Sequence, residues 1–334
     1  HTRSVHNALA AKFLWCLALA LTAITLPSKI SAGTKKVEKG DKNLSGWKDS
    51  GQLNDDIEFK GNGLTLFIDG NVSDVTLAGK IKVKNGKDPS TMTIESTSDF
   101  TGTVSLSGNN TYQGNIVLNG GAVEVIGSGK LGSGSFSGDV NLGSGGNTGV
   151  FKQNSSSTQT FSGTISGTGS LIKDNTGKLT LTGSNNYTGT TTIDGGILEA
   201  QGGSAIGDAG AVTINSGGTF EVDNNETIGR ISGAGNVNLN AILTTGDATN
   251  SGFSGNISGT GGLTKQGAST MELTGSNTYT GVTTVNAGTL RMVNSASGNG
   301  IRQSPNGGAT EVIYNYNVAS GATLEFEQNG DEIY

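Results

Sequence analysis

Several residue types that support catalysis or covalent cross-linking are scarce in this chain. Its 334 residues include one cysteine, two histidines and three prolines. Cys16, His1 and His6 all lie before Gly33. From Gly33 onward the sequence therefore excludes disulfides, a cysteine nucleophile, a Ser-His-Asp triad and a thiolate or imidazole metal site.

Positive charge is also limited. The chain carries 21 Lys and Arg against 27 Asp and Glu, for a net charge of −6 and a pI near 5.0. This composition does not predict a basic surface for DNA or RNA, so we expect no nucleic-acid partner. The sequence also lacks the Gly-Gly-x-Gly-x-Asp nonapeptide of calcium-binding β-rolls and an EF-hand loop, and we expect no cofactor or metal.

What the chain does have is glycine, at 56 positions, together with Thr, Val and Ile that often alternate with polar residues. Such alternation favours short, half-buried strands. Helix-period apolar stripes are scarce after about residue 35. We therefore expect an all-β fold.

The part of the chain before Gly61 differs in texture from the rest. Residues 1–32 contain Arg3 and Lys12, an uncharged run from 13 to 26, and Ile30 and Ala32 before a plausible cleavage point. This order predicts a secretory signal peptide. Residues 33–60 are rich in charge and are expected to form a charged leading segment.

An internal repeat predicts the architecture. Residues 161–200 and 253–292 align without a gap and agree at 22 of 40 positions, and residues 106–125 form a weaker third copy. Each copy places a tyrosine six residues after a leucine and a glycine nine residues after that tyrosine. These tyrosines are Tyr112, Tyr187 and Tyr279.

One copy contains three short strands separated by Gly and Asn turns. We expect Leu181, Ile193 and Leu198 to share one inner column, and the "SNN" after the first strand to turn the chain through left-handed asparagine conformations. Such strands are too short for a good sandwich and suit stacked coils of roughly 20–25 residues. We predict a right-handed parallel β-helix, a solenoid, over residues 61–334, with a β-sandwich as the alternative.

The segment "GGLTKQGASTMELTGSNTYTGVTTVNAGTL" resembles the autotransporter-associated β-strand repeat of bacterial type V secretion passengers, and residues 170–198 match it too. The quoted segment supplies the Leu, Lys, Gly, Asn and Tyr of that pattern in frame. The earlier copy departs from it at Asn175, where Gly is usual.

The resemblance implies a non-enzymatic β-helical stalk that is exported to the bacterial cell surface or beyond and serves adhesion. It also implies an outer-membrane translocator barrel as a partner, which we expect to lie outside this sequence. A host-cell surface, a matrix surface or a polysaccharide is the expected binding partner. No single residue can be assigned to a catalytic, cofactor or metal site.

The alternative function is a carbohydrate-active enzyme, a lyase or glycosidase, that works through carboxylates alone. The densest acidic cluster is Asp55, Asp56 and Glu58, in the charged leading segment, where a solvated face is the simpler interpretation. Asp194 and Asp223 occupy apparent turns, where we expect them to cap the backbone.

The repeated residues have structural interpretations as well. We expect the three tyrosines to pack at corners and Lys173 and Lys265 to be solvated strand residues. A flat threonine ladder is disfavoured, because the runs at 190–192 and 283–284 do not fall on successive coils.

Overall fold

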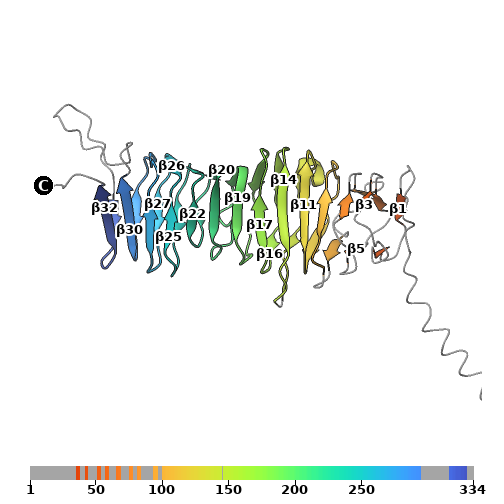
Figure 1. Cartoon of the computed structure of the whole chain (residues 1–334), viewed down its shortest axis with the longest axis horizontal. Coiled ribbons are helices and arrows are strands. Elements are labelled where there is room, and N and C mark those ends of the chain that lie inside the picture. Colours follow the sequence, from red (N-terminus) through yellow and green to blue (C-terminus); the bar gives the residue numbers. More distant parts are fainter. Residues whose placement is uncertain are drawn as a thin grey trace, which may run out of the picture.

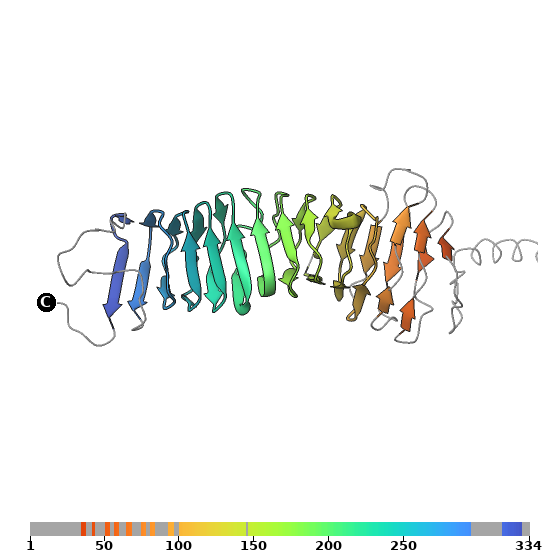
Figure 2. The ribbon, with the colours of Figure 1, turned by 90° about the horizontal axis from the view of Figure 1, so that it is seen from above.

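The protein is an elongated solenoid of parallel β-strands (Figures 1 and 2). The structure, a computed structural model, describes residues 100–144, 146–294 and 316–328, and the backbone of the strands between residues 35 and 96. Colours run in sequence order along the rod, so each coil lies beside the next (Figure 2). The described strands pair in parallel throughout, which confirms the β-helix and excludes the β-sandwich.

The rod has three faces, and all strands but two belong to a single face. The first face is the longest ladder. Its strands are β3 (Gly51–Leu53), β6 (Val75–Leu77), β9 (Thr103–Leu106), β11 (Ala122–Gly127), β14 (Val150–Ser155), β17 (Ser170–Lys173), the starts of β19 (Thr191–Ala200) and β20 (Val212–Val222), β22 (Ile231–Gly233), β25 (Ser251–Phe253), β28 (Thr270–Leu273), β30 (Thr289–Asn294) and β32 (Thr323–Gln328).

The second face contains β12 (Ser135–Phe136), β15 (Gln159–Phe161), β18 (Lys178–Leu181), the ends of β19 and β20, β23 (Asn236–Leu239) and β26 (Asn256–Gly259); the sheet of β1 (Lys35–Val37), β4 (Ile57–Phe59) and β7 (Ile81–Val83) has the same place in the chain order. The third face contains β2 (Lys42–Asn43), β5 (Thr65–Ile68), β8 (Thr93–Ser96), β10 (Asn115–Leu118), β13 (Val140–Asn141), β16 (Ile165–Ser166), β21 (Glu226–Thr227), β24 (Leu243–Thr245), β27 (Leu263–Lys265), β29 (Thr283–Val285) and β31 (Tyr316–Val318). Strands β19 and β20 run across the corner between the first two faces, which is why each belongs to both.

The strand pairing gives the length of one coil. Phe151 pairs with Leu171 on the next coil, and Leu171 pairs with Thr191 on the one after, so the sequence number rises by 20 from coil to coil. Alternate residues of each strand point inward, and consecutive coils therefore stack similar side chains. In the interior, the ring of Phe161 packs against Phe136 and Phe151, with ring centroids 5.2 and 5.3 Å apart. The core is thus a continuous column of side chains along the rod.

Equivalent residues of the two full repeat copies lie on different faces of the rod. Leu181, Ile193 and Leu198 are all fully buried, yet Leu181 and Leu198 lie on the second face and Ile193 on the first. The expected single column is therefore wrong in detail. The equivalent Leu273 lies on the first face, because the offset between the two copies is not a whole number of coils. The three faces accept the same sequence pattern.

A glycine with left-handed backbone marks one corner in every copy. Gly121, Gly196 and Gly288 have φ values of 61°, 64° and 65°. A Cβ on Gly288 would also lie 2.4 Å from the carbonyl oxygen of Ser269 on the preceding coil. Only glycine satisfies both conditions without strain.

The chain departs from the regular coil between β11 and β14. Val123 and Phe151 are partners on successive coils, although their sequence numbers differ by 28 and not by 20. The additional chain includes η3 (Gly132–Gly134), a 3-10 turn, and residues between β13 and β14. Among the residues that the structure describes, no helix is long and apolar enough to cross a membrane.

The domain limits remain predictions. The signal peptide lies outside the described residues. Strands β1, β2, β3 and β4 fall inside the charged leading segment of residues 33–60, and β2 and β3 pair in parallel with β5 and β6 beyond residue 61.

Removing one whole coil should preserve the fold. Deletion of residues 254–273 brings β30 onto β25 and leaves every remaining inward position facing inward, because the deleted segment spans one full period of the ladder. We expect β-type circular dichroism and a cooperative thermal transition. Deletion of residues 254–263 shifts the following chain by half a coil and should abolish both. Equal behaviour of the two deletions would contradict a repeating unit of one coil.

Gly288→Ala should lower the free energy of unfolding by about 1–2 kcal/mol or more, because alanine at this φ is strained and its Cβ meets backbone oxygen. Gly252→Ala is the matched control. Gly252 lies on an outer strand position with no atom within 4 Å of the added Cβ. Denaturant titration of both variants measures the difference, and a loss in Gly252→Ala as large as in Gly288→Ala would overturn this account of the corner.

Candidate functional site: corners and outer faces of the solenoid

Two lysines of the repeat lie inside the rod, which corrects the expectation that they are solvated. Lys173 and Lys265 are both fully buried. Each follows a buried leucine by two residues in the same strand and so points to the same side. The sequence already contained this signal in the spacing of Leu171 and Lys173, and of Leu263 and Lys265.

Each buried ammonium group is held by three main-chain carbonyls. The Nζ of Lys173 donates to the oxygens of Asp174, Asn175 and Gly195 at 2.7, 2.9 and 2.9 Å. Gly195 belongs to the following coil, so the lysine joins corresponding corners of two coils. The Nζ of Lys265 makes the same set of bonds to Gln266, Gly267 and Ala287.

Burial lowers the pKa of Lys173 to about 8, while the nearby Asp174 carboxylate acts in the opposite direction. Burial also lowers the pKa of Lys265. The carbonyl oxygens are good acceptors for the charged form, so the two lysines act as structural clamps inside the corner. Neither ammonium group is available to a ligand outside the rod.

The corner next to the lysine explains the departure at Asn175. Asn175 has a φ of 61°, and Gly267 at the equivalent position has a φ of 75°. Asparagine is the residue after glycine that best tolerates this conformation. The substitution of Asn for Gly therefore leaves the corner intact.

The repeated tyrosines pack as expected, and their neighbouring asparagines do something different. Tyr187 is 1% exposed and its hydroxyl lies 2.5 Å from the hydroxyl of Thr191. Asn185 does not adopt a left-handed backbone. Its side chain accepts from the Ile165 amide at 2.6 Å and donates to the Ala205 carbonyl at 2.6 Å, bridging the coils on either side.

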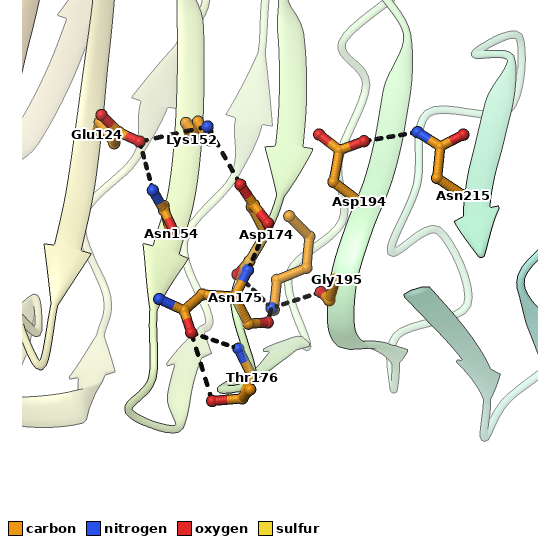
Figure 3. A network of polar contacts seen from close by, with 10 residues as sticks. Glu124, Lys152, Asn154, Asp174, Asn175, Thr176, Asp194, Gly195 and Asn215 are labelled. Atoms are coloured by element: carbon orange, nitrogen blue, oxygen red, sulfur yellow. Dashed lines mark hydrogen bonds and ion pairs between the residues drawn. The ribbon is translucent and has the colours of Figure 1, made fainter. Parts of the chain in front are cut away.

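A polar network follows the outer side of the first face, as Figure 3 shows. The Lys152 ammonium lies 3.4 Å from Glu124 on the preceding coil and 3.3 Å from Asp174 on the following one. Farther along, Asn215 donates to Asp194 at 2.6 Å. These contacts connect neighbouring coils and remain partly open to solvent, so they are worth little individually.

The other described ion pairs also run between coils. Lys178 lies 2.5 Å from Glu199 and 2.7 Å from Glu221 on the second face. On other coils, Arg230 pairs with Asp247 at 3.0 Å. Arg291 contacts Glu272 and Glu327. Charged side chains thus reinforce the stacking direction.

The acidic residues proposed for the alternative enzyme are placed as follows. Asp55 and Asp56 lie outside the described residues, and Glu58 is described only through the backbone of β4. Asp194 and Asp223 accept from the amide side chains of Asn215 and Asn240 on the next coil. These side-chain contacts of the two aspartates therefore bridge coils, in place of the expected backbone caps.

The sequence pattern did not single out the buried carboxylates, of which Glu226 is the more deeply buried. Glu226 is 2% exposed, and burial raises its pKa to about 7. Both of its oxygens accept main-chain amides, from Ala205 at 2.9 Å and Ile206 at 2.8 Å. These contacts show Glu226 bridging two coils inside the rod. In the described part of the chain, no three His, Cys, Asp or Glu side chains are grouped to hold a metal ion.

A threonine ladder does exist, contrary to the sequence argument, on the outer side of the third face. Thr227, Thr244, Thr264 and Thr284 are partners on successive coils. The threonine runs at 190–192 and 283–284 are too far apart to form a ladder by themselves. The coils between the copies supply Thr227 and Thr244, which complete it. Ile242 and Val282, the side chains two positions before Thr244 and Thr284, are 43% and 38% exposed.

Lys173→Met should lower the free energy of unfolding by about 1–3 kcal/mol at pH 7, because three buried carbonyls lose their donor. Lys152→Met, which removes an outer ammonium one coil away, is the control and should cost less than about 1 kcal/mol. Denaturant titration measures both. Equal losses would contradict the clamp.

The clamp also has a pH signature. The folded pKa of Lys173, about 8, is below the unfolded value of 10.5. The unfolded state therefore binds more protons between these values, and the Lys173 contribution to stability rises as pH increases from 8 to 10.5. The difference in unfolding free energy between the native protein and Lys173→Met should grow across this window. A constant difference would show that the pKa is not depressed.

Comparison with known proteins agrees with this architecture. The family described as Passenger-associated-transport-repeat matches residues 101–125, 171–200 and 263–292. Each segment contains the buried tyrosine and, near its end, the left-handed glycine of the corner. No solved structure matches the chain.

A curated relative is the "Adhesin BmaC autotransporter" of Brucella suis biovar 1 (strain 1330). It is 34% identical over 259 residues, which cover 70% of this chain and 8% of the relative. The chain thus corresponds to a small part of that protein's length. With three matched segments and their shared coil geometry, this chain carries the passenger-associated repeat and is similar to an autotransporter adhesin.

Proposed function

We propose that the chain is a non-enzymatic passenger that is displayed at, or released from, the bacterial surface and serves adhesion. The observation that carries the proposal is that the matched passenger repeats fold as coils of an unbroken parallel solenoid. Such a rod grows by adding coils at one end, which suits a chain that emerges progressively. The name of the Brucella relative supports the adhesive role.

The proposed partners are an outer-membrane translocator barrel and a host-cell surface, matrix surface or polysaccharide. The coils stack into an elongated rod (Figure 1). Its outer positions carry Thr, Asn, Ser and paired charges. A stalk of this kind presents a long lateral surface to such partners.

The alternative, a carbohydrate-active enzyme, has less support. Glycoside hydrolysis requires two carboxyl groups that flank a substrate bond. The described acids Asp194, Asp223 and Glu226 each bridge coils through amide donors.

Surface display and adhesion can be tested together in bacteria that carry the full chain fused to an outer-membrane translocator barrel. Proteinase added to intact cells should remove the chain. Before that treatment, the cells should adhere to cultured host cells or matrix-coated plates more than cells with the barrel alone. A protected chain would overturn surface display, and equal adherence would overturn adhesion. Polysaccharide cleavage by the purified chain would favour the enzyme.

A further inference from the structure

The outer surface contains a cleft where three successive coils meet at the irregular part of the solenoid. Its volume is about 520 Å³, and its described lining comes from residues 100–103, 119–122, 146–148 and 150. Small-molecule sites in proteins have volumes of about 300–1,000 Å³. The cleft is therefore large enough for a ligand of a few rings.

The cleft lies where the coil between Val123 and Phe151 is longer than the 20-residue coils that follow it. The additional chain before β14 forms one wall. This wall is fixed at two points, because the Thr168 hydroxyl of the next coil donates to the Asn147 carbonyl at 2.7 Å and the Gly149 amide donates to the Leu142 carbonyl at 3.1 Å. The wall is thus part of the folded solenoid.

The polar side chains that the structure describes in the lining are neutral, and four of them are available to a ligand. Among the described residues of the lining, none is charged. Within the described part of the chain, the side-chain amides of Asn119 and Asn147 and the hydroxyls of Thr101 and Thr148 have no hydrogen-bond partner. Amides and hydroxyls both donate and accept, which matches the hydroxyl groups of a sugar.

The main chain in the lining is already paired, which disfavours an extended peptide. The Gly102 carbonyl accepts from Ala122 at 2.9 Å, and the Gly121 carbonyl accepts from Val150 at 3.0 Å. A peptide that binds by strand addition requires an open ladder edge. Recognition must therefore use the side chains of the lining.

The absence of charge among the described lining residues also disfavours a charged ligand. A carboxylate, sulfate or phosphate in the cleft would lose hydration without gaining an opposite charge. Phe100, Ala122 and Val150 add apolar surface to the lining, which suits the C–H faces of a sugar ring.

We propose that this cleft binds a neutral glycan through the amide side chains of Asn119 and Asn147 and the hydroxyls of Thr101 and Thr148. The inference rests on the proposed adhesive function, because a surface passenger meets glycans outside the cell. It goes further by naming the site and the ligand class. The chemistry of the described lining disfavours acidic glycans and extended peptides.

The test uses the purified full chain on an array of neutral gluco-, manno-, galacto- and N-acetylglucosamine tetrasaccharides with sialylated and sulfated counterparts. Calorimetry then gives the Kd of the best neutral binder. The double substitution of Asn119→Ala and Asn147→Ala should weaken binding at least tenfold. Asn286→Ala is the control, because Asn286 is exposed on the third face far along the sequence from the cleft, and it should leave the Kd unchanged.

Thermal unfolding of each variant checks the fold. If the double variant does not fold, Thr148→Val replaces it, since Thr148 is exposed and should still weaken binding severalfold. The proposal is overturned if no neutral tetrasaccharide binds, if only acidic ones bind, or if the folded variants bind as the native chain does. Failure here with successful adhesion of displaying cells would leave the proposed function standing. Glycan binding by the purified chain without adhesion of displaying cells would support the glycan site and overturn the adhesive function.

Discussion

Stacking of each coil on the next is the constraint on which the whole structure depends. A single coil buries only a thin row of side chains, and its main-chain groups are paired by the coils before and after it. The core is shared between coils and belongs to none of them alone. The hydrophobic column and the long strand ladder of the first face are both continuous because neighbouring coils repeat the same spacing.

Polar residues support this stacking from inside the rod. Lys173 and Lys265 each tie three carbonyls at a corner, Asn185 bridges the coils on either side, and Glu226 holds two amides. Corners are the places where strand ladders stop, so main-chain groups would otherwise remain unpaired there. The buried polar residues of the repeat are therefore part of the fold, and the outer faces are left for binding.

The misplaced lysines show where sequence reasoning stopped short. Lys173 is charged, and a charged residue in a polar segment is normally solvated. Its spacing from Leu171 nevertheless places both on one side of a strand. The carbonyls that make burial tolerable come partly from Gly195 on the next coil, so the compensation is visible only in the fold. The threonine ladder was missed for the same reason, since its rungs include coils without a clear repeat.

The sequence alone determined the all-β class, the parallel solenoid and the role of the repeated tyrosines, because these follow from local alternation and a periodic frame. The left-handed glycine of each copy is likewise a local requirement. Only the tertiary structure decided which face each copy occupies, how the buried lysines are satisfied, and that a lengthened coil leaves a neutral cleft beside Asn119 and Asn147. Those outcomes depend on the total length of the coils between distant segments. The residue pattern within one repeat cannot give that length.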